Sequence, residues 1–228
     1  MSGNDHRGPL IAVINATPAS VSPARAAMAE SFPEASVWNL LDDRLISDAE
    51  AAGGLTPALS GRMLKLIDYA VGGGADAVLL SCSMYGPVVE QARRDGELPM
   101  LSSDEALFDE VASRRFGSVL LLGPLQPAVE DSITRLGHVL TSSGSETRIV
   151  GQVAPGAIEA TARGDINELG QILQAAASAH VGDIEAVVLG NFSLAPARAA
   201  LEDALHIPVL SAPGLAAARL RRSLQVNR

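Results

Sequence analysis

The residues of this sequence that could do chemistry follow short apolar runs. Cys82 lies in Ser81-Cys-Ser-Met-Tyr85, after the apolar run that begins at Ala77 and shortly before Pro87. A thiol between a buried strand and the start of a helix is a usable base or nucleophile, because a helix N-terminus lowers a thiol pKa. A lone cysteine is also often a small buried hydrophobe, so both roles stay open for Cys82.

Three further segments follow apolar runs in the same way. They are Asn15-Ala-Thr17, Gly123-Pro124 and Gly190-Asn-Phe-Ser193. The carboxyl ends of parallel strands are where α/β proteins bind ligands, since helix N-termini there offer unpaired N–H groups. Two of the few aromatic residues fall in these segments: Tyr85 could donate to a carboxylate or enolate, and Phe192 could line an apolar pocket. Core packing is the alternative for both.

The elements that must position these residues alternate between strand-length apolar runs and longer amphipathic stretches, which predicts an α/β fold with parallel sheets. We expect strands at Leu10–Asn15, Ser36–Leu40, Ala77–Ser81, Ser118–Leu122, Glu146–Val150, Ala186–Gly190 and Pro208–Leu210. Helices are expected at Pro23–Ser31, Thr56–Val71, Pro87–Arg94, Asp104–Arg114, Ala128–Leu136, Asp165–Ala179, Pro196–Leu205 and Gly214–Leu224. Asp42–Gly54 and Leu140–Ser145 are interpreted as loops.

An internal repeat fixes the architecture. The segment from Ala75 to Pro87 aligns with the segment from Ile184 to Pro196 at a constant spacing of 109 positions, and the same spacing relates Leu98 to Ile207. Matched prolines at both ends of this gapless stretch favour duplicated βα units over chance similarity. The sequence therefore predicts two similar lobes, each a parallel sheet flanked by helices, related by a pseudo-two-fold axis with a cleft between them.

Composition excludes several functions. With 17 Lys and Arg against 26 Asp and Glu, the net charge of −9 argues against nucleic acid and anionic membrane surfaces as partners. A single cysteine allows no internal disulfide and no cysteine-rich zinc site, and it is typical of a reducing cytoplasm. No P-loop or metal-ligand spacing occurs, and Gly72-Gly-Gly74 precedes a strand where a dinucleotide fingerprint would follow one. We therefore expect no cofactor, no metal and a cytoplasmic protein.

These features resemble the aspartate/glutamate/hydantoin racemase superfamily, which includes maleate isomerase and arylmalonate decarboxylase. The resemblance covers nearly the whole chain and rests on short motifs: Asn15 after the first strand, Cys82 in the first half, and Gly190-Asn191 at the counterpart in the second half. In that family two similar domains hold a small carboxylate between two cysteines, without cofactor or metal. The resemblance implies that the last helix returns to the first lobe, which gives a first lobe of 1–115 plus 213–228 and a second of 116–212.

Asn191 occupies the position of the family's second cysteine. An amide cannot exchange a proton near neutral pH, so this chain has one of the two groups that two-base racemisation needs. The resemblance implies functional roles for Cys82, Asn15, Gly190 and Asn191. From their strand-end positions we expect Tyr85 as a further catalytic candidate, and Thr17, Ser81, Ser83, Gly123, Phe192 and Ser193 as further parts of the carboxylate site. A cofactor-independent racemase-like enzyme acting beside the carboxylate of a small amino acid or dicarboxylate is the leading hypothesis. A one-base decarboxylase or cis-trans isomerase and a non-catalytic carboxylate-binding protein are the alternatives, and a homo-oligomer is left open.

Overall fold

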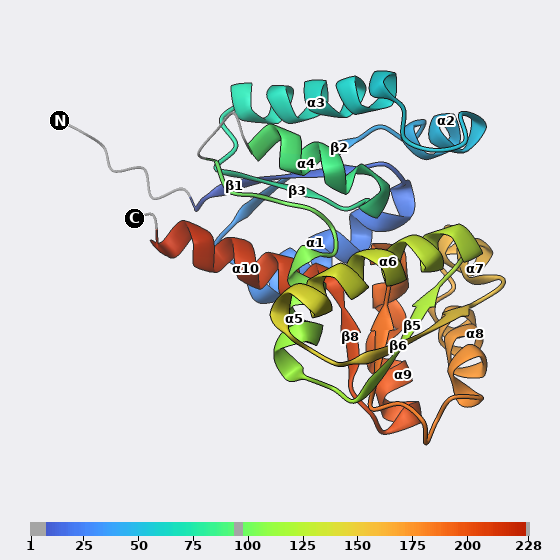
Figure 1. The fold of residues 1–228 in the computed structure, drawn as a ribbon. Helices are drawn as coiled ribbons and strands as arrows, with labels where there is room; N and C mark the ends of the chain where they lie inside the picture. Colours follow the sequence, from blue (N-terminus) through green and yellow to red (C-terminus); the bar gives the residue numbers. More distant parts are fainter. Residues whose placement is uncertain (1–7, 94–97, 227–228) are drawn as a thin grey trace. The chain divides into compact units, whose positions relative to one another are not determined.

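The computed structural model describes residues 8–93 and 98–226, which form two compact units. The first unit contains the residues up to Ser103 and again from Ala217 on, and the second contains Asp104–Ala216. Each unit is an α/β layer built on its own parallel sheet (Figure 1), which confirms the predicted fold class. The unit boundary lies before helix α5 (Glu105–Arg114), rather than after residue 115, because α5 contacts α6 (Gln126–Ser143) of the second unit.

The first unit has four parallel strands in the order β2-β1-β3-β4. Ile14 and Leu80 point to a face covered by helices that contribute Met63, Ile67 and Val88 to the core. The strands are β1 (Leu10–Asn15), β2 (Ser36–Leu41), β3 (Ala77–Leu80) and β4 (Met100–Leu101). The helices are η1 (Pro18–Ser20), α1 (Val21–Ser31), α2 (Leu45–Ala51), α3 (Pro57–Gly72), η2 (Ser83–Tyr85) and α4 (Gly86–Arg93).

The second unit repeats this topology in the order β6-β5-β7-β8. Leu120 and Leu122 lie against Leu169, Leu173 and Leu201 of the helices on one face, while α6 covers the other face in Figure 1. The strands are β5 (Ser118–Gly123), β6 (Arg148–Val153), β7 (Ala186–Leu189) and β8 (Val209–Ser211). The further helices of this unit are α7 (Ala157–Arg163), α8 (Ile166–Ser178), η3 (Phe192–Ala197) and α9 (Arg198–Leu205). Helix α10 (Ala212–Val226) begins in this unit and belongs to the first unit from Ala217 on.

The two sheets share one register. Ile11 pairs with Ala77 in the first sheet, and the residues that the repeat places opposite them, Val119 and Ala186, pair in the second. A one-residue slip would turn every side chain of a strand to the other face of its sheet. Because the register is shared, equivalent residues at the strand ends of the two sheets point to equivalent faces. The internal repeat is therefore a repeat of structure as well as of sequence.

Two segments interpreted as loops contain helix. Asp42–Gly54 includes α2, which begins at Leu45 and buries Leu45 and Ala49, and α6 continues through Leu140 to Ser143. Short polar helices lack the long periodic pattern that sequence reasoning detects, and α2 is held by tertiary packing of its few apolar residues. Helix α6 ends only at Gly144, whose φ of 66° provides a left-handed cap.

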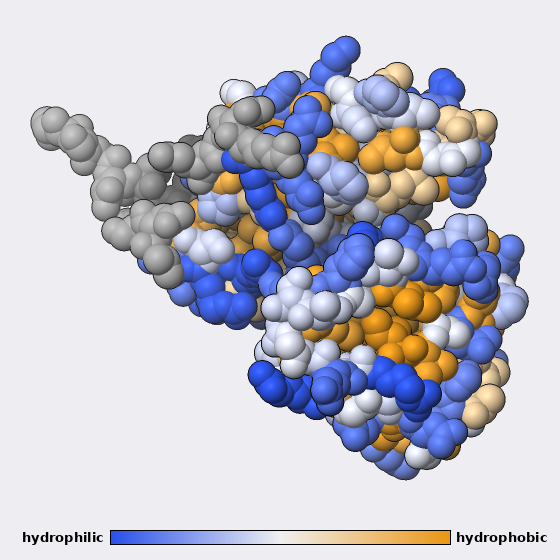
Figure 2. All heavy atoms as spheres, viewed as in Figure 1, coloured by the Kyte–Doolittle hydropathy of each residue, from blue (hydrophilic) through white to orange (hydrophobic). Residues whose placement is uncertain are grey.

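Helix α6 lies close to β5 and β6 because two strand residues have no side chain. A Cβ on Gly151 would come within 2.4 Å of Ile133 Cδ1 and 2.8 Å of Val129 Cγ1, and a Cβ on Gly123 would come within 2.7 Å of Val129 Cγ2. Strand β6 forms the edge of the sheet beside α6, and Figure 2 shows apolar surface gathered over this region. The two glycines thus set the distance between α6 and the strands that it covers.

Replacing Gly151 with Ala should lower the free energy of unfolding by about 1–3 kcal/mol, because the new methyl group overpacks the contact with α6. The matched control is Gly137→Ala in α6, where a Cβ meets no atom within 4 Å and a helix-interior glycine is replaced. That control should raise stability by about 0.5–1 kcal/mol. Urea unfolding measures both, and a neutral Gly151→Ala variant would contradict the close packing of α6.

Candidate active site

Cys82 and Asn191 occupy equivalent positions in the two units. Cys82 follows β3, has φ −120° and ψ 120°, and precedes the 3-10 helix η2. Asn191 follows β7, has φ −133° and ψ 144°, and precedes η3. Both side chains are half-buried, and neither caps the helix that follows. The repeat therefore holds a thiol and an amide in the same local frame, one at each strand end.

Asn15 and Ser81, both predicted to bind substrate, bond to each other inside the first unit. The Ser81 hydroxyl donates to Asn15 Oδ1 at 2.8 Å, and Asn15 Nδ2 lies 3.3 Å from the carbonyl oxygen of Leu40. Asn15 has no exposed surface, and Ser81 is 4% exposed. The side chain of Asn15 therefore links the ends of β1, β2 and β3, and the structure gives this pair a structural role beside the predicted one.

The second unit has glycines at both equivalent positions. Gly123 ends β5 where Asn15 ends β1, and Gly190 follows β7 where Ser81 follows β3. The backbone hydrogen bond is kept, since Ser81 N–H donates to Ile14 at 3.0 Å and Gly190 N–H donates to Leu122 at 2.9 Å. A Cβ on Gly123 would lie 3.7 Å from Asn191 Oδ1, so the structure brings the amide of Asn191 over the end of β5.

Tyr85 uses its hydroxyl inside the first unit. The Tyr85 hydroxyl donates to the carbonyl oxygen of Leu45 in α2 at 2.9 Å, and the ring has no exposed surface. Burial first, and then the neighbouring Cys82, raise the pKa of Tyr85 to about 12. A phenol with this pKa and this partner serves poorly as an acid or base near neutral pH, so the catalytic role of Tyr85 stays a prediction.

Sequence reasoning missed an ion-pair network on α2 and α3. Arg62 of α3 lies 2.5 Å from Asp42 and 2.7 Å from Asp48, and Arg44 lies 3.0 Å from Asp48. The hydrogen bond from Arg44, and then that from Arg62, lower the pKa of Asp48. The four-residue spacing from Arg44 to Asp48 is typical of a helical turn. The interpretation of this segment as a loop did not take that spacing into account. The network ties α2 to α3 beside the Tyr85 hydrogen bond.

Burial separates the remaining predicted residues into two groups. Phe192 is 2% exposed, and Gly123 and Gly190 are buried. Thr17, Ser83 and Ser193 are half-buried, as are Cys82 and Asn191. Thr17 Oγ1 accepts from the N–H of Ala19 at 3.4 Å, which leaves its hydroxyl proton for another acceptor. The half-buried polar side chains are therefore better placed than the buried residues to contact a small anion.

A buried ion pair lies at the start of α5. Asp104 pairs with Arg135 of α6, which also contacts Asp131 at 2.8 Å and lies over the Phe108 ring, 5.3 Å from its centroid. Burial raises the pKa of Asp104 even though Arg135 opposes that shift. Arg135 Nη2 is buried with no hydrogen-bond partner among the described residues. The two carboxylates nevertheless balance the charge of the guanidinium.

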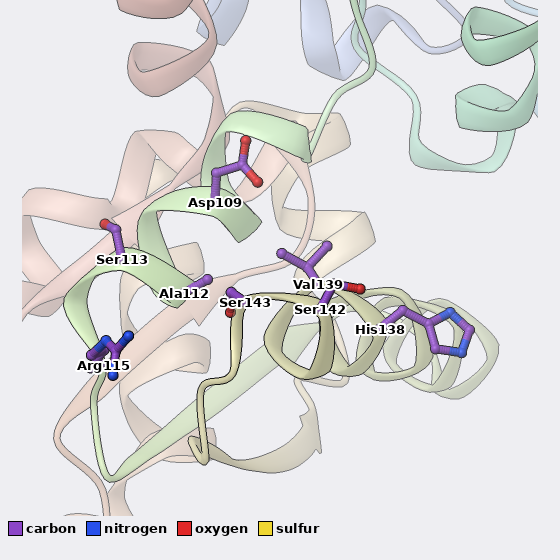
Figure 3. A pocket seen from close by; sticks show the side chains of 8 residues that line it. All are labelled: Asp109, Ala112, Ser113, Arg115, His138, Val139, Ser142 and Ser143. Carbon is purple, nitrogen blue, oxygen red and sulfur yellow. The ribbon is translucent and has the colours of Figure 1, made fainter.

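A pocket in the second unit lies apart from the predicted site residues. A cavity of about 590 Å³ lies between α5 and α6, and Figure 3 shows Asp109 and Arg115 on one side with His138 and Ser142 on the other. These residues lie towards the C-terminal ends of the two helices. Because α6 follows β5 at Gly123, this pocket is at the amino end of the strand and Asn191 is at its carboxyl end.

Residues 8–93 and 98–226 contain neither a metal-binding cluster nor a membrane-spanning helix. No cluster of three or more His, Cys, Asp or Glu side chains in these ranges could hold a metal ion. No helix within the same ranges is both long and apolar enough to cross a membrane.

Comparison with known proteins identifies the class. Residues 12–220 match the family described as Asp/Glu/Hydantoin racemase. An aspartate racemase from Picrophilus torridus superposes with a TM-score of 0.73 at 14% identity, covering 96% of this chain and 95% of that one. An allantoin racemase from Klebsiella pneumoniae gives 0.71 at 17% identity, covering 96% and 89%. An unliganded arylmalonate decarboxylase gives 0.60 at 20% identity, covering 94% and 92%.

The chain belongs to the Asp/Glu/hydantoin racemase family, since the family match spans most of its length. No protein with a curated description matches the sequence. The structural likenesses lie at 20% identity or below for these three proteins, so they establish the shared fold.

Replacing Tyr85 with Phe should destabilise the protein at pH 8 by about 1 kcal/mol, because a buried hydrogen bond to Leu45 is lost. Tyr85 ionises at a higher pH in the folded state than the ordinary value of 10, so native stability falls as pH rises from about 10 towards 12. The Phe variant lacks this dependence, and its deficit should shrink at pH 11. Urea unfolding at both pH values tests this, and a deficit that grows with pH would contradict it.

Replacing Asn15 with Ala should lower the free energy of unfolding by about 1–3 kcal/mol, because the buried Ser81 hydroxyl loses its 2.8 Å acceptor and keeps only the Ile14 carbonyl oxygen at 3.4 Å. Ser81→Ala should cost less, and the double variant should cost less than the two single variants together by about 0.5–1.5 kcal/mol. Unchanged stability in Asn15→Ala would instead favour a direct role of this side chain in binding substrate.

Proposed function

We propose that this chain is a cofactor-independent enzyme that acts at the carbon next to a carboxylate, with Cys82 as its single proton-transferring thiol. The observation that carries the proposal is the equivalence of Cys82 and Asn191, which share a backbone frame at matching strand ends while only one of them can carry a proton. Family membership supplies the class of chemistry, and the names of the structural relatives suggest small carboxylates or their cyclic amides as substrates.

The proposed step is proton exchange at one face of the substrate. The thiolate of Cys82 removes the α-hydrogen as a proton, and the electron pair of the C–H bond moves into the adjacent carboxylate to form an enediolate. Return of a proton from the Cys82 thiol re-forms the bond and leaves the thiolate for the next cycle. Thr17 and Ser83, which belong to the same unit as Cys82, are the proposed hydrogen-bond donors to the enediolate oxygens.

A second candidate is decarboxylation, which the likeness to an arylmalonate decarboxylase favours. In that reaction the bond between the α-carbon and one carboxylate breaks, and its electron pair forms an enediolate as carbon dioxide leaves. The Cys82 thiol protonates the carbon on one face, and solvent reprotonates the thiolate. This chemistry needs one proton donor at carbon, which matches a chain with a single cysteine.

Replacing Cys82 with Ser should abolish turnover, lowering kcat/KM at least about 100-fold, because a serine hydroxyl is too weak an acid to replace the thiol. The melting temperature should remain nearly unchanged, since the side chain is half-buried and of similar size. Hydrogen exchange in heavy water, followed by NMR, measures the activity. Retained activity per folded molecule with a large loss of stability would show that Cys82 is a packing residue.

The unmodified protein should exchange the α-hydrogen of one enantiomer far faster than that of the other, or should form one enantiomer of a decarboxylated product. Asn191→Cys would place a thiol at the equivalent strand end and should create or raise interconversion of enantiomers. Asn191→Ser is the matched control, because it has a similar size without a group that ionises near neutral pH. Efficient racemisation by the unmodified protein would overturn the one-base mechanism.

A binding protein without turnover would give different results in these experiments. It would show ligand binding by calorimetry and no Cys82-dependent exchange or decarboxylation on amino acids, cyclic amides or substituted malonates. That result would replace the enzyme proposal with the binding alternative.

A further inference from the structure

Tyr85 bonds the turn that carries Cys82, residues 82–86, to helix α2. The Tyr85 hydroxyl donates to the Leu45 carbonyl oxygen at 2.9 Å, and the Tyr85 N–H donates to the Cys82 carbonyl oxygen at 3.3 Å. Tyr85 and Leu45 have no exposed surface, and Cys82 packs against the core cluster that contains both. The side chain of one buried residue therefore contacts α2, while its backbone contacts the residue that carries the thiol.

Helix α2 depends on other elements for its position. It has seven residues, and no side chain caps its N-terminus. A helix this short is marginal in water and is stabilised by contacts with the rest of the fold. Its buried side chains are Leu45 and Ala49. Because these two side chains are small in total area, hydrogen bonds and ion pairs to neighbouring elements contribute to fixing α2.

Arg62 of α3 provides two such contacts. Its guanidinium bonds Asp42, before α2, at 2.5 Å and Asp48, within α2, at 2.7 Å. Asp42 Oδ1 also accepts from the N–H of Arg44 at 3.3 Å. A planar guanidinium that bonds two carboxylates fixes orientation as well as distance. Leu45 lies between the two carboxylates in the chain, so both bonds restrain the position of its carbonyl group.

The charges of this network also act on the Tyr85 hydroxyl. Burial first, and then Cys82, raise the pKa of Tyr85 to about 12. Arg62 opposes that shift, and Asp42 and Asp48 add to it. Since the interaction between charges weakens with distance, these effects agree with a hydroxyl that lies near both the thiol and the ion pairs.

The second unit differs at the equivalent place. The repeat aligns Leu194 with Tyr85, and Leu194 is buried without a hydroxyl. The ion pair described between α7 and α8 joins Arg163 to Glu168, at the end of one helix and the start of the next. The hydroxyl contact to the preceding helix is therefore a feature of the unit that carries the thiol.

We propose that Arg62 is a positioning residue for the Cys82 thiol. By holding α2 to α3, Arg62 keeps the Leu45 carbonyl oxygen in place for the Tyr85 hydroxyl, and Tyr85 in turn fixes the turn that presents Cys82. This inference rests on the proposed function, and it adds a residue that acts through α2 and Tyr85. A displacement of a reacting group by about 1 Å is enough to lower turnover by about 10-fold or more.

Replacing Arg62 with Met should lower kcat of Cys82-dependent turnover about 10-fold and change KM less than about 2-fold, because the thiol moves while the carboxylate-binding groups stay. The assay uses the amino acid, cyclic amide or substituted malonate that the unmodified protein converts fastest. The variant should fold, since exposed ion pairs contribute little to stability. Arg62→Lys keeps the charge without the two-carboxylate geometry, so its kcat should be intermediate.

Arg114→Met is the matched control. Arg114 also pairs with a carboxylate, Glu110, and its side chain is 46% exposed against 38% for Arg62. This control should leave kcat unchanged. An equal loss of kcat in both Met variants, or a Lys variant as slow as Arg62→Met, would overturn the inference.

A double-mutant cycle tests whether Arg62 and Tyr85 act through the same contact. Tyr85→Phe removes the bond to Leu45 and should lower kcat by a factor similar to that of Arg62→Met. The double variant should also lose about 10-fold, whereas independent effects would multiply to about 100-fold. Multiplied effects would overturn the inference.

Amide hydrogen exchange, measured by mass spectrometry, provides a readout that needs no substrate. In Arg62→Met, exchange should rise about 10-fold in peptides that cover α2 and residues 82–86, and it should stay unchanged in the second unit. Arg114→Met should leave both sets of peptides in the first unit unchanged.

Three results would overturn the inference: unchanged amide exchange at residues 82–86 in Arg62→Met, an equal rise throughout the protein, or faster local exchange with unchanged kcat. The absence of Cys82-dependent turnover with every compound would instead overturn the proposed function. Amide exchange alone would then decide whether Arg62 positions the turn that carries Cys82.

Discussion

The parallel register between β1 and β3, and between β5 and β7, is the constraint on which the site depends. It sets Ile14 beside Leu80 and Leu122 beside Leu189, so the residue after each strand lies at a common edge. Cys82 and Asn191 each follow that edge by one further residue in extended backbone. Because side chains alternate along a strand, any other register would present a different residue at these positions.

The two units share this frame and use it differently. In the first, Asn15 and Ser81 fill the strand ends with a buried hydrogen bond. In the second, Gly123 and Gly190 leave the same place without side chains, and Val129 and Asn191 lie next to it. The two units are therefore equivalent scaffolds with different side chains. The first has the thiol of Cys82 next to the polar pair of Asn15 and Ser81, and the second has the amide of Asn191 next to Gly123 and Gly190.

The class of fold was readable from the sequence because apolar runs of strand length and amphipathic stretches alternate regularly. The constant spacing between the segments at Ala75 and Ile184 fixed the duplication, and the structure confirms it in the order and register of the sheets. The strand-end location of Cys82 and Asn191 followed from the same pattern. Local periodicity carries this information, since one buried face per element is enough to produce it.

Other features depended on contacts between residues far apart in the sequence. Asn15 and Tyr85 were polar candidates on sequence grounds, and only the fold shows their side chains bonded to Ser81 and to the Leu45 carbonyl. The short helix α2 is stabilised by packing and by Arg62 of α3, so its own sequence contains little helical signal. Sequence pattern specified where the chain bends and which faces are buried. Tertiary structure decided which polar groups are already satisfied and which can meet a ligand, because a hydrogen-bond partner is set by distance in space.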